Sequence, residues 1–287
     1  MSTESQYMVV GIDGSPCSTK ALQWAEANVD RFGLIQPVSA LQTPWWAFSP
    51  TAFGATTPPS SMEFQAEAEK VARQALSQVD PTKLLEPLTV HGLTGPNLVT
   101  IGETASLIVV GTRGRGSLAA GVLGSVSLHC VNHAKVPVVV VPPDATVPSG
   151  FDRVVVGVDG SDSSIAALRW ALRNTSSTSE IVAVYGWERD SSAVSDVASM
   201  AQDKLDELAQ ELIEDTVDRA RRLEQSDRAV TLLPQCDDPR VVLREAAANA
   251  DLLVVGARGR RGVAYLLLGS VASAVVNHPM VPTVVVR

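Results

Sequence analysis

Residues 9–15 read VVGIDGS, and residues 155–161 repeat them as VVGVDGS. The two aspartates of these motifs, Asp13 and Asp159, lie 146 residues apart. Three later motifs recur in the same order at an offset of 145. They are VVGTRGRG (109–116) and VVGARGRRG (254–262), LGS (123–125 and 268–270), and VPVVV (136–140) with VPTVV (281–285). So long and regular an offset indicates the duplication of a whole domain, because solenoid repeats are much shorter.

The size and composition of the chain agree with two folded domains. The chain has 287 residues, of which 45% are hydrophobic and 19% charged, as in globular proteins. Each half is long enough to bury its own core. We therefore predict one domain at residues 1–143, a Pro-rich linker at 144–150, and a second domain at 151–287.

Apolar strands alternate with amphipathic helical stretches in each copy. The strand segments are unbroken apolar runs, which are typical of a parallel sheet covered on both faces. Alternating strands and helices predict an α/β fold, a doubly wound sheet in each of two tandem domains. In the second copy, Ser161 or Ser163 caps the first helix. The strands there are expected at 153–158, 180–187, 229–234, 252–256 and 283–287, and the later helices at 194–225, 239–249 and 269–277.

Each copy also contains a glycine-rich loop with the spacing G-x₂-G-x₉-G-S, after a strand and before a helix. Glycine allows backbone N–H groups to approach an anion closely, and a helix that starts there adds its positive end. The serine that follows the last glycine is placed either to donate to a phosphate or to cap the helix. The loop residues are Gly111, Gly114, Gly124 and Ser125 in the first copy and Gly256, Gly259, Gly269 and Ser270 in the second.

Nearby arginines favour a phosphate ligand, although a purely structural turn is the alternative. The loop is not a Walker A motif, because no Gly-Lys-Ser/Thr follows, and no G-x-G-x-x-G follows the first strand. The same spacing in two copies is better explained by a ligand than by two tight turns. The arginines are Arg113, Arg115, Arg258, Arg260 and Arg261.

These motifs together resemble the universal stress protein family in its tandem two-domain form. The resemblance rests on the VG[IV]DGS opening, the glycine loop and the closing valine strand, and it covers nearly the whole chain twice. It implies a five-stranded parallel sheet in each copy, with strand order 3-2-1-4-5. It also implies ATP as the ligand of members that carry this glycine motif, and Mg²⁺ is a candidate companion of the phosphates.

The resemblance further implies a role for each motif residue. Asp13 and Asp159, at the ends of the first strands, would contact the adenine or ribose. Ala40 and Gly186, late in the second strands, would border the base. The ribose and phosphates would be held by Gly111, Gly114, Gly124, Ser125, Gly256, Gly259, Gly269 and Ser270. The residues show an alternative for the aspartates, because Asp before Gly-Ser also forms a turn that starts a helix.

No repeated catalytic group accompanies the loops. Only His133 and His278 match between the copies, and both are expected at a helix C-terminus, where histidine suits the helix dipole. No metal-ligand cluster repeats. We therefore expect an ATP-binding regulatory protein that acts through its conformation or partners. The alternatives are a slow ATPase or a nucleotidyl or phosphoryl transferase, and a scaffold with vestigial pockets.

Charge and hydropathy limit the partners. Residues 1–150 carry 8 basic and 11 acidic side chains, and residues 151–287 carry 15 and 20, which disfavours nucleic acid as a partner. The sequence shows no membrane span and no secretory signal, so we expect a cytoplasmic protein. The Val-rich last strands are expected to pair between the copies, and a homodimer is a further expectation. For the Trp- and Pro-rich loop 43–60 we expect one of three roles. It packs on its own domain, or it covers the pocket, or it contacts the other copy.

Overall fold

The computed structural model describes residues 6–41, 61–114, 123–147, 150–188, 196–260 and 267–287. Contacts divide the chain into two compact units, Met1–Val136 and Pro137–Arg287, and each is described by itself. The predicted loop at 43–60 lies outside the described residues.

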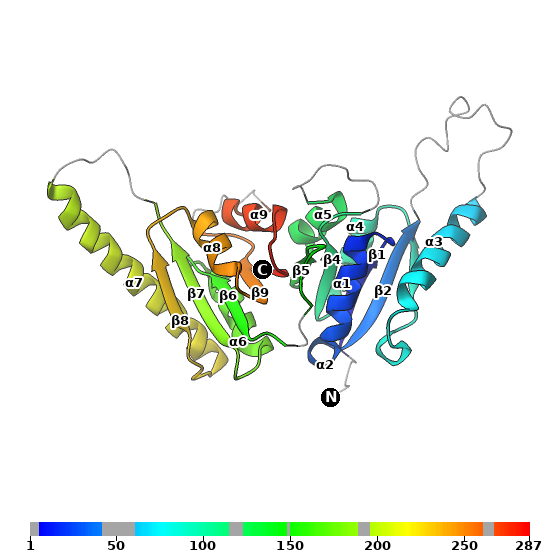
Figure 1. Cartoon of the computed structure of the whole chain (residues 1–287), viewed down its shortest axis with the longest axis horizontal. Helices are drawn as coiled ribbons and strands as arrows, with labels where there is room; N and C mark the ends of the chain where they lie inside the picture. The colour runs from blue at the N-terminus through cyan, green and yellow to red at the C-terminus, as the bar shows by residue number, and fades with distance from the viewer. Residues whose placement is uncertain (1–5, 42–60, 115–122, 148–149, 189–195, 261–266) are drawn as a thin grey trace, which may run out of the picture. The chain divides into compact units, whose positions relative to one another are not determined.

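The described part of the first unit contains four parallel strands and the helices that connect them (Figure 1). The strands are β1 (Tyr7–Ile12), β2 (Leu34–Leu41), β3 (Leu88–His91) and β4 (Leu107–Gly111). They pair in the order β3-β2-β1-β4. The helices are α1 (Pro16–Ala27), α2 (Val29–Phe32), α3 (Ser61–Leu76), α4 (Thr94–Ile101) and α5 (Ser125–His133), with 3₁₀ turns at Pro81–Lys83 and Gly102–Thr104.

The second unit repeats this plan and adds a strand at the edge. Its parallel strands are β6 (Arg153–Gly157), β7 (Glu180–Gly186), β8 (Thr231–Gln235), β9 (Leu252–Gly256) and β10 (Thr283–Val286). They pair in the order β8-β7-β6-β9-β10, which is the predicted 3-2-1-4-5 order. The helices are α6 (Asp162–Asn174), α7 (Asp196–Glu224), α8 (Pro239–Ala247) and α9 (Ser270–Asn277). The predicted α/β fold in two tandem domains is confirmed.

Strand β5 (Val138–Val141) pairs antiparallel with β10, so that Val139 lies opposite Val284. The predicted pairing of the two Val-rich strands is therefore confirmed within the second unit. Because β5 pairs with β10, the second compact unit begins at Pro137, although the first sequence repeat extends to residue 143. The predicted domain boundaries stay a prediction.

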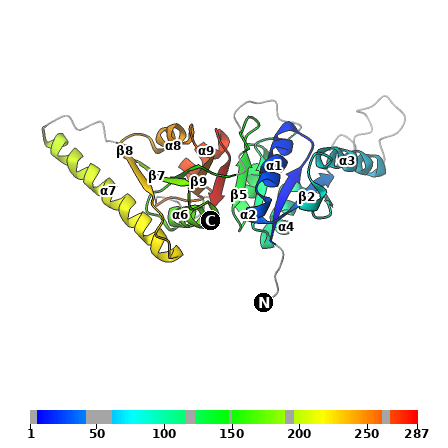
Figure 2. The ribbon, with the colours of Figure 1, turned by 60° about the horizontal axis from the view of Figure 1, so that its bottom comes forward.

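Helices cover both faces of the second unit's sheet (Figures 1 and 2). Helices α6 and α7 pack against each other on one face, and α8 packs with α9 on the other. Strands in the middle of the sheet are consequently buried on both sides, as Val154, Val155 and Val156 of β6 show with no exposed surface. The unbroken apolar runs of the sequence reflect this double burial.

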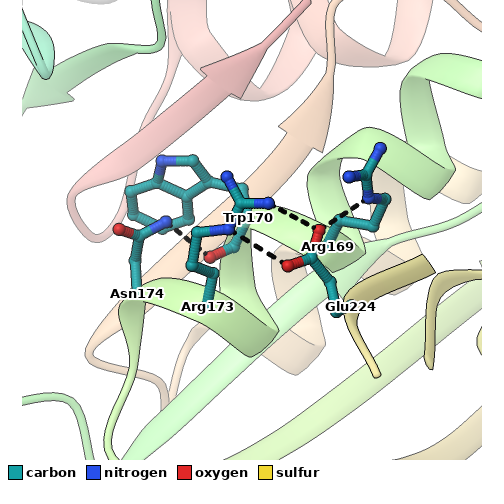
Figure 3. Close-up of polar contacts among 5 residues, drawn as sticks. All are labelled: Arg169, Trp170, Arg173, Asn174 and Glu224. Atoms are coloured by element: carbon teal, nitrogen blue, oxygen red, sulfur yellow. Dashed lines mark hydrogen bonds and ion pairs between the residues drawn. The ribbon is translucent and has the colours of Figure 1, made fainter. Parts of the chain in front are cut away.

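Helix α6 starts from a serine cap and is fastened to α7 by an ion cluster. Ser161 is the N-cap, and its hydroxyl accepts from the Ser164 N–H at 3.1 Å, which decides between the two predicted caps. At the far end of α7, Glu224 accepts from Arg169 Nε at 2.7 Å and from Arg173 Nε at 3.0 Å (Figure 3). The Glu224 side chain is only 10% exposed, so these contacts fix the packing of α7 on α6.

Glu224→Ala is expected to lower the free energy of unfolding by about 2 kcal/mol, because two arginines held together would lose their shared carboxylate. Urea denaturation followed by circular dichroism measures the change. Glu207→Ala on the same helix is the control, since its ion pair with Lys204 is well exposed and should leave the stability unchanged. Equal effects of the two variants would contradict the assigned role of Glu224.

Burial raises the pKa of the Cys130 thiol in α5 to about 12. At pH 8 only about one such thiol in ten thousand is then a thiolate, the reactive form. In the native protein, iodoacetamide is expected to alkylate the partly exposed Cys236 and to leave Cys130 unmodified. Peptide mass spectrometry before and after denaturation checks this, and native labelling of Cys130 at the Cys236 rate would contradict it.

Candidate functional site

The second unit has a cavity of about 920 Å³ at the carboxyl ends of β6, β7 and β9. This volume is in the range of small-molecule sites, and the position is where open α/β sheets bind their ligands. The structure brings the six residues predicted in the second copy together around it. They are Asp159, Gly186, Gly256, Gly259, Gly269 and Ser270.

Asp159 joins the turn after β6 to the glycine loop. Its Oδ1 accepts from the Ser161 N–H at 3.0 Å, and its Oδ2 accepts from the Arg260 N–H at 2.8 Å. The Ser161 hydroxyl adds a bond to the Arg258 carbonyl at 3.2 Å. The predicted turn role of this aspartate is therefore present, and the carboxylate also fixes the loop. Contact of Asp159 with a base or ribose stays a prediction.

The first copy contains the same arrangement around Asp13. Its Oδ1 accepts from the Ser15 N–H at 2.9 Å, and the Ser15 hydroxyl donates to the Arg113 carbonyl at 3.3 Å. Ser15 also caps α1 by accepting from the Ser18 N–H at 3.1 Å. In both repeats, the serine hydroxyl thus links the first turn to the glycine loop.

Gly259 and Gly114 are glycines because the aspartate lies directly beside them. A Cβ placed on Gly259 would lie 2.5 Å from Oδ2 of Asp159, and one on Gly114 would likewise collide with Oδ2 of Asp13. Any larger residue would push the carboxylate out of its place. The middle glycine of the motif therefore serves the shape of the loop.

Gly256 and Gly111 end their strands beneath the first helix of each repeat. A Cβ on Gly256 would lie 2.6 Å from the backbone carbonyl of Ser163, and one on Gly111 equally close to that of Cys17. These glycines consequently allow a helix to pass very close to the sheet. Their role in the structure is packing, and direct contact with a ligand stays a prediction.

The last glycine of each motif is the N-cap of the helix that follows. Gly269 is the N-cap of α9 and Gly124 that of α5, and neither cap makes a side-chain bond. Ser270 and Ser125 are the exposed first helical residues. The prediction that these serines cap the helix is wrong, because the cap is one residue earlier. Donation to a phosphate remains their predicted role.

The expected base-side residues lie at the ends of the second strands. Gly186 ends β7 and lines the cavity, and a Cβ there would lie 2.6 Å from Cα of Pro239. Ala40 lies near the end of β2, opposite Val90 of β3, and is partly exposed. Both positions fit the predicted border of a base, although the structure does not test that role.

Two cavity-lining aromatics had not been predicted. Tyr185 and Trp187 flank Gly186, and their rings stack with centroids 5.7 Å apart. The sequence signal that could have revealed them is the presence of an aromatic residue on each side of Gly186 at the strand end. The corresponding residues of the first copy are Ser39 and Leu41, so the two repeats differ here.

Positive charge gathers on the glycine-loop side of the cavity. Arg258 and Arg260 both line it. In the part of the chain that the structure describes, no group of three or more His, Cys, Asp or Glu is placed to hold a metal ion.

A doubly wound sheet with a cavity at the carboxyl ends of its strands defines the class of open α/β proteins. The model of the universal stress protein family matches residues 5–142 and again residues 150–287. The chain belongs to the universal stress protein family.

Curated relatives and solved structures agree with this family. Universal stress protein Rv1996 of Mycobacterium tuberculosis is 33% identical over 98% of this chain and 94% of its own length. The structure of a universal stress protein from Archaeoglobus fulgidus covers 99% of both chains with a TM-score of 0.68 and 22% identity, which supports the fold. A universal stress protein solved in complex with cAMP is 28% identical and covers 48% of this chain and 98% of its own, with a TM-score of 0.37.

Among the helices that the structure describes, none is both long and apolar enough to span a bilayer.

Proposed function

We propose that the protein is a nucleotide-binding regulator in which each repeat holds one adenine nucleotide, ATP in the first instance. The observation that carries this proposal is the division of the second unit's cavity into two sides. From β7 and α8 it is lined mostly by apolar residues, Val184, Gly186, Pro239 and Leu243, with Glu188 beyond the strand end, whereas Arg258, Gly259, Arg260, Gly269 and Ser270 line it from the glycine loop and the start of α9. A nucleotide has the same division, with a flat base at one end and phosphates at the other.

On the basic side, the chain offers the groups that phosphates require. The N–H groups at the start of α9 and the Gly259 loop are the proposed cradle, with the Ser270 hydroxyl beside it. Arg258 and Arg260 supply charge that neutralises phosphate oxygens. Asp159 contributes by holding the Arg260 segment, through the bond to its N–H. Mg²⁺, when bound, would neutralise charge on the phosphates next to Ser270 and the glycine loop.

On the apolar side, the base would lie against β7 and α8. Because Gly186 has no side chain, β7 approaches Pro239 closely. This wall of the cavity therefore consists of backbone and apolar side chains. Such a wall suits a planar ring and provides backbone groups for its polar edge. The first repeat would use Ala40 at the same position, next to the equivalent loop of Gly111, Gly114, Gly124 and Ser125.

The proposed response is a change of conformation or partner when nucleotide binds. The glycine loop is tied to the start of α6 through the Asp159 carboxylate and the Ser161 hydroxyl. Phosphates that order the loop would therefore act on α6. In this account the nucleotide is a signal, and rapid turnover is no part of the function.

The test is to denature the freshly purified protein and identify any released nucleotide by chromatography, and to titrate nucleotide-free protein with ATP, ADP, AMP and cAMP in the presence of magnesium. Retained adenine nucleotide, or saturable binding with a Kd below about 1 mM, supports the proposal. No retained nucleotide and no saturable binding would overturn it and favour a scaffold with vestigial pockets. Phosphate release above the blank, lost in Gly114→Ala/Gly259→Ala, would favour the slow ATPase.

A further inference from the structure

The two repeats differ in the residue that follows their last strand. The VPVVV and VPTVV motifs align residue 142 of the first repeat with residue 287 of the second. Pro142 stands at this position in the first copy and Arg287 in the second. Only the second repeat therefore has a side-chain donor and a positive charge here.

Arg287 holds the segment that leads into α9. Its Nη2 donates to the carbonyl oxygen of Leu267 at 3.2 Å, two residues before the N-cap Gly269. Two backbone bonds complete the link. The Ala257 N–H donates to the Val286 carbonyl at 2.7 Å, and the Gly269 N–H donates to the Ala257 carbonyl at 2.8 Å. These bonds thus join β10, the residue after β9 and the start of α9.

The first repeat keeps only part of this link. The Gly124 N–H donates to the Thr112 carbonyl at 2.7 Å, which matches the Gly269 bond. Pro142 has no side-chain N–H and cannot make the equivalent of the Arg287 contact. The start of α9 is therefore fixed by a side chain of the chain's own last strand segment, whereas the start of α5 has no such contact from residue 142.

The residues that line the cavity include Arg258 but not Arg287. Burial lowers the pKa of the Arg287 guanidinium, and the charge of Arg258 lowers it further. An arginine remains protonated despite such a shift. The contribution of Arg287 to the site is therefore its bond to the segment that leads into α9.

We infer that Arg287 is a positioning residue that makes the second site the stronger one for a nucleoside triphosphate, so that the two repeats fill in sequence, the second before the first. The inference rests on the proposed function. Arg287 acts on the segment that begins α9, where the phosphates would lie, and the base and ribose are held by other residues. Its effect should therefore grow with the number of phosphates.

The experiment isolates the second site by using Gly114→Ala, which disables the first loop, as the background. In this background, Arg287→Met keeps the apolar stem and removes both the donor and the charge. Isothermal titration with ATP and with AMP measures the two affinities. We expect about a tenfold weaker Kd for ATP, which corresponds to about 1.4 kcal/mol, and about a twofold change for AMP.

Three controls keep the result interpretable. Arg222→Met removes one positive charge from an exposed position on α7 and should leave both affinities unchanged. Arg287→Met in the Gly259→Ala background reports on the first site, which should also be unchanged. Arg287→Gln keeps a donor for the Leu267 carbonyl without the charge and should weaken ATP less than Arg287→Met does, and it serves as the main variant should Arg287→Met not fold.

An unchanged ATP affinity at the second site, or equal weakening of ATP and AMP, would overturn the inference. Either result is distinct from failure of the proposed function, in which the Gly114→Ala background itself would show no saturable binding of either nucleotide. A first site that binds ATP more tightly than the second in the two single-glycine variants would also overturn it.

Discussion

Gly259→Ala is expected to abolish ATP binding in the second repeat, and Gly114→Ala to do so in the first. The added Cβ at Gly259 would lie 2.5 Å from Oδ2 of Asp159, the atom that accepts from the Arg260 N–H. The carboxylate must then move, and the loop that carries Arg258 and Arg260 loses its attachment. We expect at least about a hundredfold weaker Kd for the affected site, measured by isothermal titration.

Gly150→Ala is the matched control, because a Cβ there meets nothing within 4 Å. It should bind ATP like the unmodified chain. Each glycine variant should lose one site and keep the other, since the two loops are built separately. Full binding by the double variant Gly114→Ala/Gly259→Ala would show that the nucleotide does not use these loops.

Gly256→Ala is expected to have a large effect on stability, with a loss of about 3 kcal/mol or more in the free energy of unfolding. The new Cβ would lie 2.6 Å from both the carbonyl carbon and the carbonyl oxygen of Ser163. These are backbone atoms of α6, which a rotamer change cannot move. The helix itself must shift away from β9, and its packing on the sheet is lost.

Gly269→Ala is the control from the same motif, because its nearest atoms would be 3.5 Å away in ordinary contact. Its change in stability should stay below about 1 kcal/mol. Chemical denaturation of both variants measures the difference. Equal stability of Gly256→Ala and the unmodified chain would contradict the close approach of α6 to β9.

The fold was predictable because its signals are local and occur twice. Unbroken valine runs such as residues 154–156 identify strands that are buried on both faces. The long helix expected at 194–225 is α7 at Asp196–Glu224, because its amphipathic pattern continues over many turns. Repetition of the VGxDGS and glycine motifs identified the strand ends, where the structure places the cavity of the second unit.

The contacts that shape the site were not predictable, because they join residues far apart in sequence. The bond from the Arg260 N–H to Asp159 spans 101 residues, and the Asp motif itself also fits a simple turn. From the sequence, Arg287 is expected only at the end of a strand, and its contact with Leu267 follows from the fold. Of the two roles predicted for Ser270, the cap of α9 falls to Gly269 instead, since glycine and serine are both common at N-caps. Cytoplasmic location, a homodimer and bound Mg²⁺ stay predictions.

The most direct test of the central claim, one adenine nucleotide in each repeat, is the stoichiometry of ATP binding to nucleotide-free protein with magnesium. The account predicts two ATP per chain in the unmodified protein and one in each of Gly114→Ala and Gly259→Ala. The single site left in Gly114→Ala should be the tighter of the two. No saturable binding, or two ATP still bound by the double variant, would contradict the account.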